Sequence, residues 1–136
     1  MKTNNQNLDT GFVQGWPLAL LRLEGALVFI LSIVLYERTS ASWWLFVALL
    51  LVPDLVMFAY LWSARWGAVF YNAAHSYAGP VLLIAFATAR SRPEWLPYLF
   101  IWVAHIAIDR SLGYGLKYAV GFKQTHLGLL GSRKSA

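Results

Sequence analysis

The sequence contains no cysteine, and charged residues make up only 12% of its 136 positions. Without cysteine, the chain has no disulfide framework, no thiolate nucleophile and no thiolate metal ligand. A soluble domain usually carries about 25% charged residues, because charged side chains keep its surface in water. The shortage of charge therefore argues against an ordinary water-exposed surface and indicates that lipid surrounds most of the chain.

Several familiar catalytic and binding patterns are also missing. The sequence has no G-x-S-x-G nucleophile elbow, no Walker phosphate loop and no G-x-G-x-x-G fingerprint after a strand. Its net charge is +5, but the basic residues are scattered at the ends of apolar stretches rather than gathered in one stripe. We therefore expect no nucleic-acid partner, and the basic residues fit the loops of a membrane protein.

Apolar residues account for 59% of the sequence and concentrate in four stretches, at about residues 16–36, 43–62, 66–89 and 95–118. Each has roughly 20 residues or more, the length with which a helix crosses about 30 Å of hydrocarbon. Because the connections are short, we expect antiparallel neighbours. The sequence thus predicts an all-α, four-helix transmembrane bundle over residues 16–119. A polar N-terminal tail (1–15) precedes it, and a basic, interfacial juxtamembrane tail (120–136) follows it.

The distribution of lysine and arginine predicts the orientation of the bundle. With a cytoplasmic N-terminus, the cytoplasmic side holds Lys2, Arg65, Lys117, Lys123, Arg133 and Lys134. The opposite side holds Arg38, Arg90 and Arg92. Cytoplasmic loops carry the excess of basic residues in membrane proteins, so we expect both termini in the cytoplasm.

Eight polar residues occur where a bilayer excludes them: Arg22, Glu24, Asp54, Asn72, His75, His105, Asp109 and Arg110. A charge at mid-membrane costs a few kcal/mol, so each group needs a partner, a water-filled cavity or a function. At about 1.5 Å per residue from the predicted helix ends, Glu24, Asp54, His75 and Asp109 reach one level, about 12–13 Å above the cytoplasmic side. His105 lies one turn from Asp109, on the same helix face. The sequence therefore predicts that four helices bring ionisable groups together.

The sequence leaves three interpretations of this level open. The ligand types of His75, His105, Asp54 and Asp109, with Glu24 as a further carboxylate, suit a divalent metal such as zinc, iron or manganese. Alternatively, the same groups form a structural network of interhelical hydrogen bonds. A third interpretation is a proton or ion pathway, which would require a homo-oligomer because four short helices make a thin wall around a pore.

The segment from residue 110 to residue 131 has a different character, with five glycines that predict turns. Lys117 is placed to meet lipid phosphates at the membrane surface. His126 either folds back beneath the polar level as a further ligand or base, or belongs to an amphipathic tail that lies on the membrane.

Six sequence blocks occur in order along the chain: RLEG (22–25), SWWLF (42–46), PDL (53–55), YNAAHSYAGP (71–80), IWVAHIAIDRSLGYGLKY (101–118) and GFKQTHLG (121–128). Together they resemble the bacterial family of small integral membrane proteins known as domain of unknown function 4260. The resemblance covers nearly all of residues 16–131 and includes every polar residue singled out above. It implies a multi-pass protein of the bacterial inner membrane and says little about activity.

The leading functional hypothesis is a membrane-embedded, metal-dependent enzyme that acts on a lipidic or amphiphilic substrate. In this hypothesis the ligands or acid–base groups are Asp54, His75, His105 and Asp109, with Glu24 as a base or supporting partner. The residues expected to contact a substrate headgroup are Asn72, Arg110, Lys117 and His126. The alternatives are an oligomeric protein that conducts or binds protons, ions or a small solute, and a structural membrane subunit without catalytic activity.

Overall fold

The computed structural model describes residues 13–119 and 123–129. Their helices are α1 (Gly15–Glu37), α2 (Trp43–Leu49), the 3-10 helix η2 (Val52–Leu61), α3 (Ala64–Ala74), α4 (Ala78–Ala89), the short η3 (Pro93–Trp95) and α5 (Leu96–Leu112). Two strands of two residues, β1 (Gln124–Thr125) and β2 (Gly128–Leu129), pair antiparallel. The four predicted apolar stretches therefore correspond to α1, to α2 with η2, to α3 with α4, and to α5, which confirms the all-α helical bundle.

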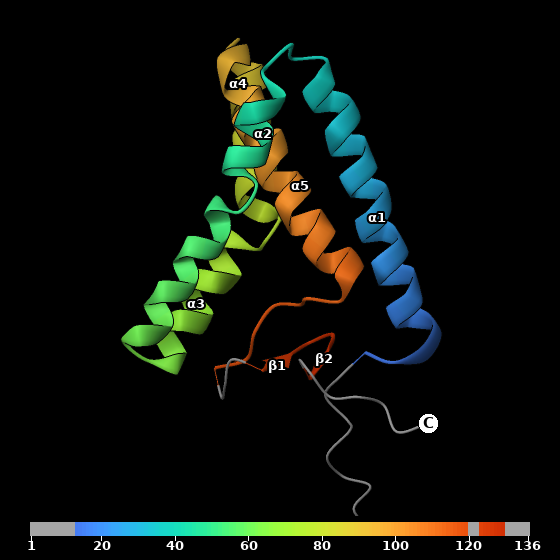
Figure 1. Cartoon of the computed structure of the whole chain (residues 1–136), viewed down its shortest axis with the longest axis vertical. Helices are drawn as coiled ribbons and strands as arrows, with labels where there is room; N and C mark the ends of the chain where they lie inside the picture. The colour runs from blue at the N-terminus through green and yellow to red at the C-terminus, as the bar shows by residue number, and fades with distance from the viewer. Residues whose placement is uncertain (1–12, 120–122, 130–136) are drawn as a thin grey trace, which may run out of the picture.

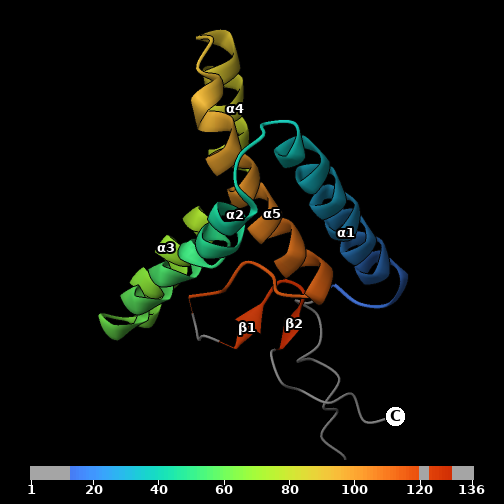
Figure 2. The same ribbon diagram turned by 45° about the horizontal axis from the view of Figure 1, so that its top comes forward.

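Helix α5 lies at the centre of the arrangement (Figures 1 and 2). Helix α1 packs along α5 on one side, α4 packs against α5 at one end, and the paired η2 and α3 diverge from α1 on the other side. The two short strands lie beyond the C-terminal end of α5. Most of the predicted tails, at residues 1–12, 120–122 and 130–136, lie outside the described residues.

The contact between α1 and α5 is close because Gly25 has no side chain. A Cβ atom at this position would lie 2.7 Å from the backbone nitrogen of Ser111 and 2.9 Å from Cβ of Arg110. Near the other end of α1, Tyr36 is fully buried and packs edge-on against Phe46 of α2, while its hydroxyl donates a hydrogen bond to the carbonyl of Ser42. These contacts fix α1 and α2 against α5 at both ends of the long helix.

Two helical segments, Gly15–Glu37 and Trp43–Leu61, are long and apolar enough to cross a membrane. Few of their residues are buried, and large apolar side chains such as Leu27, Ile30 and Phe58 are exposed. A core helix of a soluble protein would bury these side chains against its own chain. The exposed apolar surface indicates that the protein associates with a membrane.

Two of the predicted helices are interrupted, and proline gives the physical reason in each case. The helix predicted over 43–62 leaves the α conformation after Leu49, because Pro53 has no N–H to donate to a carbonyl four residues earlier. The helix predicted over 66–89 is corrected to α3 and α4, separated at residues 75–77. The ring of Pro80 would clash with the carbonyl of Ser76 in a continuous helix.

Side chains of α5 satisfy the backbone at the second interruption. The indole N–H of Trp102 donates to the carbonyl of Ala74 at 2.6 Å, and Nη2 of Arg110 donates to the carbonyl of His75 at 3.0 Å. A break in a helix inside a membrane requires such partners, since lipid provides none. Side chains of α5 therefore stabilise the break between α3 and α4.

The helix predicted over 95–118 is also corrected, because α5 ends at Leu112. Gly113 follows with φ +94°, a left-handed conformation that stops a helix and favours glycine. Beyond it, the chain folds back on itself, with Lys117 paired to Thr125 in an isolated antiparallel bridge. The amide of Val13, just before α1, donates to the carbonyl of His126, so this hairpin also contacts the start of the described chain.

Candidate metal centre

Four of the predicted ligands meet at one point. Asp54 stands in the first turn of η2, His75 caps the C-terminus of α3 at the helix break, and His105 and Asp109 are one turn apart on α5. One ligand atom from each residue lies within 4.8 Å of every other. The structure thus brings together residues that are distant in the sequence, since Asp54 and Asp109 are 55 positions apart.

The separations of the ligand atoms match the edges of a coordination shell. Nε2 of His75 lies 3.0 Å from Nε2 of His105, 3.3 Å from Oδ1 of Asp54 and 3.5 Å from Oδ2 of Asp109. Nε2 of His105 lies 3.6 Å from the Asp54 oxygen and 3.8 Å from the Asp109 oxygen. With metal–ligand distances of about 2.0–2.1 Å, the edges of a tetrahedron are about 3.4 Å. The four atoms are therefore spaced to surround one cation.

The ring of His75 is oriented by Tyr71, one turn earlier on α3. Nδ1 of His75 lies 2.9 Å from the carbonyl of Tyr71, so Nδ1 carries the proton and donates it to that oxygen. The two rings also stack, with centroids 3.7 Å apart and planes inclined by 12°. This leaves the lone pair of Nε2 directed at the cluster, the arrangement in which histidine binds a metal.

His105 is held differently. Its side chain is 1% exposed, and its Nε2 faces the cluster. Its Nδ1 is buried and has no hydrogen-bond partner in the part of the chain that the structure describes. The two histidines therefore differ at Nδ1. That of His75 donates to a carbonyl, and that of His105 has no partner among the described residues.

The carboxylates form the accessible side of the centre. The side chain of Asp54 is 33% exposed and that of Asp109 is 19% exposed, whereas the histidines are closed off at 3% and 1%. Catalytic metal sites keep one coordination position open to water or substrate. In this cluster, such a position lies on the carboxylate side.

Asn72 and Lys117, both predicted to contact a headgroup, contact each other. The side-chain amide of Asn72 donates to the carbonyl of Lys117 at 2.8 Å and accepts from its N–H at 2.7 Å. The ammonium group of Lys117 lies over the ring of Tyr71, 4.1 Å from its centroid. Burial lowers the pKa of Lys117 to about 8, and the charges of Asp54 and Asp109 oppose this shift. These contacts tie the segment after α5 to α3, next to the metal centre.

Residues 18–130 match the sequence profile of a family described as Domain of unknown function (DUF4260). The chain belongs to the DUF4260 family. This confirms the resemblance carried by the six sequence blocks. No curated protein and no solved structure matches the chain. The chemistry of this DUF4260 protein must therefore be argued from its own side chains.

Glu24, Arg110 and His126 are not among the four converging residues and share a second cavity in the DUF4260 fold. This cavity of about 230 Å³ is also lined by Tyr77. Glu24 is exposed on α1 and is absent from the group of four converging ligands. The prediction that Glu24 supports the same centre is not reflected in this geometry, because α1 faces the other side of α5 from η2 and α3.

The sequence assigned no role to Tyr71, Tyr77 or Trp102. Each of them lies beside the polar groups of the DUF4260 fold. One signal was available for Tyr71, which precedes His75 by four residues and so shares its helix face. No comparable spacing marks Trp102 as the partner of the helix break.

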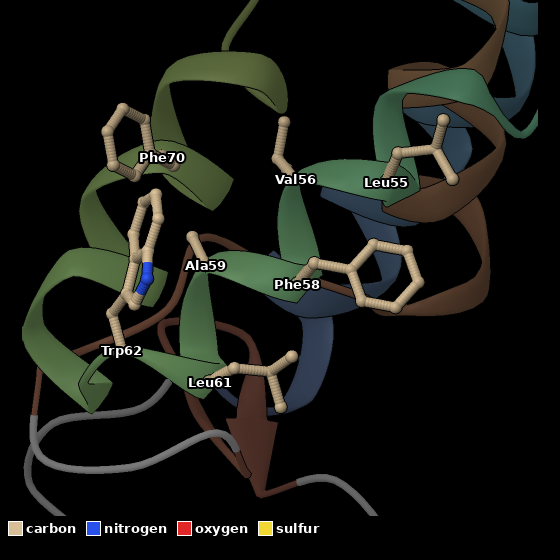
Figure 3. A pocket seen from close by; sticks show the side chains of 7 residues that line it. All are labelled: Leu55, Val56, Phe58, Ala59, Leu61, Trp62 and Phe70. Atoms are coloured by element: carbon tan, nitrogen blue, oxygen red, sulfur yellow. The ribbon is translucent and has the colours of Figure 1, made fainter.

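A separate apolar hollow of about 540 Å³ is formed by η2 and by Phe70 of α3 (Figure 3). Trp62 lies on the same side of η2 as Phe70, while Phe58 and Leu61 point to the side away from Phe70. Its lining contains no titratable side chain. It therefore provides no group for catalysis or metal binding and fits a surface covered by lipid.

Proposed function

We propose that this DUF4260 protein is a multi-pass protein of the bacterial inner membrane that carries a divalent metal and acts as an enzyme on a lipidic or amphiphilic substrate. The observation that supports this proposal most directly is the convergence of Asp54, His75, His105 and Asp109. Their ligand atoms are separated by distances expected of one coordination shell. Two imidazoles and two carboxylates suit zinc, iron or manganese.

Charge balance also favours a cation at this position. Two carboxylates and two buried histidines lie within 4.8 Å of one another. With neutral histidines, the carboxylates carry a formal charge of −2, which the nearby charges of Lys117 and Arg110 offset only from outside the cluster. A divalent cation between the two carboxylates would neutralise them directly.

A bound divalent metal supplies Lewis acidity and lowers the pKa of a water molecule at its open position. The residues of the chain do the positioning. Tyr71 fixes the ring of His75, and α5 sets His105 and Asp109 one turn apart. The partial exposure of Asp54 and Asp109 provides the access that a substrate needs.

An apolar cavity beside the centre supports an amphiphilic substrate. It has a volume of about 330 Å³ and is lined in part by Pro53, Ala74 and Trp102. Pro53 and Ala74 immediately precede the ligands Asp54 and His75 along the chain. A ligand with a hydrocarbon chain in this cavity would therefore present its polar end to the metal centre.

Elemental analysis of the purified protein, prepared without chelators, tests the proposal. The wild type is expected to contain zinc, iron or manganese in near-stoichiometric amount, and His75→Ala, His105→Ala and Asp109→Ala are expected to lose it. His126→Ala is the matched control, because it removes a histidine outside the cluster and is expected to retain the metal. A folded wild type free of metal, or alanine variants that retain metal, would refute the metal centre.

A proton pathway is the second candidate, and the hydrogen bonding of the His105 ring favours it. Because Nδ1 of His105 has no described partner, the tautomer with the proton on Nε2 leaves no buried N–H unpaired. That Nε2–H can donate a hydrogen bond to Nε2 of His75, 3.0 Å away, and the Nδ1–H of His75 donates to the Tyr71 carbonyl, so the two rings form a continuous hydrogen-bonded chain. This candidate predicts a homo-oligomer in nanodiscs and proton flux in liposomes that His105→Ala abolishes. A monomer without flux would rule it out.

A further inference from the structure

The second cavity is lined by Arg110, which also bonds to the carbonyl of the metal-centre residue His75. Its polar lining comes from four places: Glu24 on α1, Tyr77 at the start of α4, Arg110 near the end of α5, and His126 in the turn between the strands. It contains none of the four candidate metal ligands. It is therefore a separate site whose function the metal proposal does not use.

Three of the lining residues, from different elements, carry hydrogen-bond donors. The guanidinium of Arg110 is anchored by its bonds to the carbonyls of His75, at 3.0 Å, and Tyr114, at 3.5 Å. These two bonds occupy only part of its five N–H donors. The hydroxyl of Tyr77 is buried and has no hydrogen-bond partner within residues 13–119 and 123–129. A buried hydroxyl without a partner is costly, so a ligand oxygen would satisfy it.

The third donor is His126, whose tautomer is set by the backbone. The N–H of Leu116 donates to Nδ1 of His126 at 2.8 Å, so in the neutral ring the proton is on Nε2. Burial lowers the pKa of His126, and the positive charge of Arg110 lowers it further. At neutral pH this histidine is therefore an uncharged N–H donor.

The fixed charges of the cavity are then one positive and one negative. Arg110 carries the positive charge and Glu24 the negative charge, and the two do not form an ion pair in the described structure. A simple anion would meet the repulsion of Glu24, and a simple amine would meet that of Arg110. A ligand that carries both charges is complementary to both residues.

We propose that this cavity binds a zwitterionic headgroup made of a phosphate and a primary ammonium group. The phosphate oxygens accept hydrogen bonds from Arg110, Tyr77 and His126, and the ammonium pairs with Glu24. The walls next to these groups include the apolar side chains of Leu21 and Leu127, which accommodate the start of a hydrocarbon chain. The site does not depend on whether the neighbouring centre holds a metal.

Native mass spectrometry of the full-length protein in detergent tests this proposal. The probes are phosphatidylethanolamine and phosphatidylglycerol with identical acyl chains, so that only the headgroup differs. The wild type is expected to bind the ethanolamine lipid about tenfold more tightly, as expected for a charge-assisted hydrogen bond. Glu24→Gln is expected to abolish this preference, and Tyr77→Phe is expected to weaken binding of both lipids. The matched controls are Glu37→Gln on the same helix and the exposed Tyr118→Phe, both outside the cavity.

Equal binding of the two lipids by the wild type, or a preference that survives in Glu24→Gln, would overturn the proposal. So would displacement of the lipid by inorganic phosphate as effectively as by O-phosphoethanolamine. Displacement by O-phosphoethanolamine alone supports the site and identifies the free headgroup compound as a ligand. Binding of the intact lipid that neither soluble compound displaces also supports it and identifies the lipid. Metal content measured on the same samples separates this result from the metal proposal, since Glu24→Gln and Tyr77→Phe are expected to keep the metal.

Discussion

Nε2 of His75 and Nε2 of His105 lie 3.0 Å apart, and both side chains are almost completely buried. The proton of His75 is on Nδ1, where it meets the carbonyl of Tyr71, so the lone pair of its Nε2 points toward His105. Two lone pairs at this distance repel each other. The contact therefore requires a cation or a shared proton between the rings, and the carboxylates of Asp54 and Asp109 are placed to stabilise either one.

Replacing Asp54 by Asn should weaken metal binding by at least the roughly 10-fold to 100-fold seen when a residue that only supports a ligand is lost. The amide keeps the size of the side chain but removes a negative charge and a carboxylate ligand. The measurement is competition with a chromogenic chelator. Glu94→Gln serves as the control, because Glu94 is exposed and pairs with Arg92 at 3.5 Å, away from the cluster. Equal affinity in Asp54→Asn and the wild type would remove Asp54 from the ligand set.

Removing the metal should lower the thermal stability of the wild type. A ligand that binds only the folded state adds about 2.7 kcal/mol at a free concentration one hundred times its Kd. We expect the unfolding temperature to fall after dialysis against a chelator and to recover when zinc or manganese is added. His105→Ala should show no response to either treatment. Identical unfolding of the treated and untreated wild type would contradict a metal linked to folding.

Asn72→Ala should release the segment after α5. It removes both hydrogen bonds to the main chain of Lys117, and a buried polar group left without a partner costs about 1–3 kcal/mol. Hydrogen exchange at the amide of Lys117 should accelerate, while exchange at α1 stays unchanged. Asn72→Asp, which keeps an acceptor for the Lys117 N–H, should give an intermediate effect. Unchanged exchange in Asn72→Ala would show that other contacts hold this segment.

The stability of the protein should fall in mild acid because of His126. Its folded-state pKa is lowered from 6.5, first by burial and then by the charge of Arg110. Below pH 6.5 the unfolded chain therefore binds a proton that the folded chain rejects, so the free energy of unfolding decreases as the pH falls. Denaturation at a series of pH values from 7.5 downward should show this loss in the wild type. His126→Gln should show a smaller loss, and an equal slope in both proteins would exclude His126 as its source.

Gly25→Ala should force α1 away from α5 and destabilise the protein by about 1–3 kcal/mol. The added Cβ would lie 2.7 Å from the backbone nitrogen of Ser111, and backbone atoms cannot move aside as a flexible side chain can. Gly79→Ala is a graded control, because its Cβ would meet the ring of Trp102 at 3.1 Å. The unfolding temperature of Gly25→Ala should therefore be lower than that of Gly79→Ala.

The level of the metal centre was predictable from the sequence because depth along a helix depends only on residue count. The rise per residue placed Asp54, His75 and Asp109 at one height, and the structure brings their ligand atoms together with that of His105. Glu24 has the same predicted height but lies in a different cavity. Counting residues gives the depth of a side chain along its helix, but not which neighbouring helix the side chain faces.

The interruptions of the helices were harder to predict. Pro53 and Pro80 are visible in the sequence, yet a proline inside a membrane helix either kinks it or ends it, depending on what satisfies the freed carbonyls. Here Trp102 and Arg110 donate hydrogen bonds to the carbonyls of Ala74 and His75. These donors are far along the chain, and no local sequence pattern connects them to the break.

The carbonyls of Ala74 and His75 have consequences for the synthesis of the protein. Their hydrogen-bond donors, Trp102 and Arg110, leave the ribosome only after the whole of α3 and α4 has been made. Until then, a chain inserted into lipid would expose two unsatisfied carbonyls at the break. We therefore expect the α3–α4 segment to stay in a hydrated or protein-lined environment during translation and to enter the bilayer together with α5. On this basis we expect the two segments to insert in one joint step rather than independently.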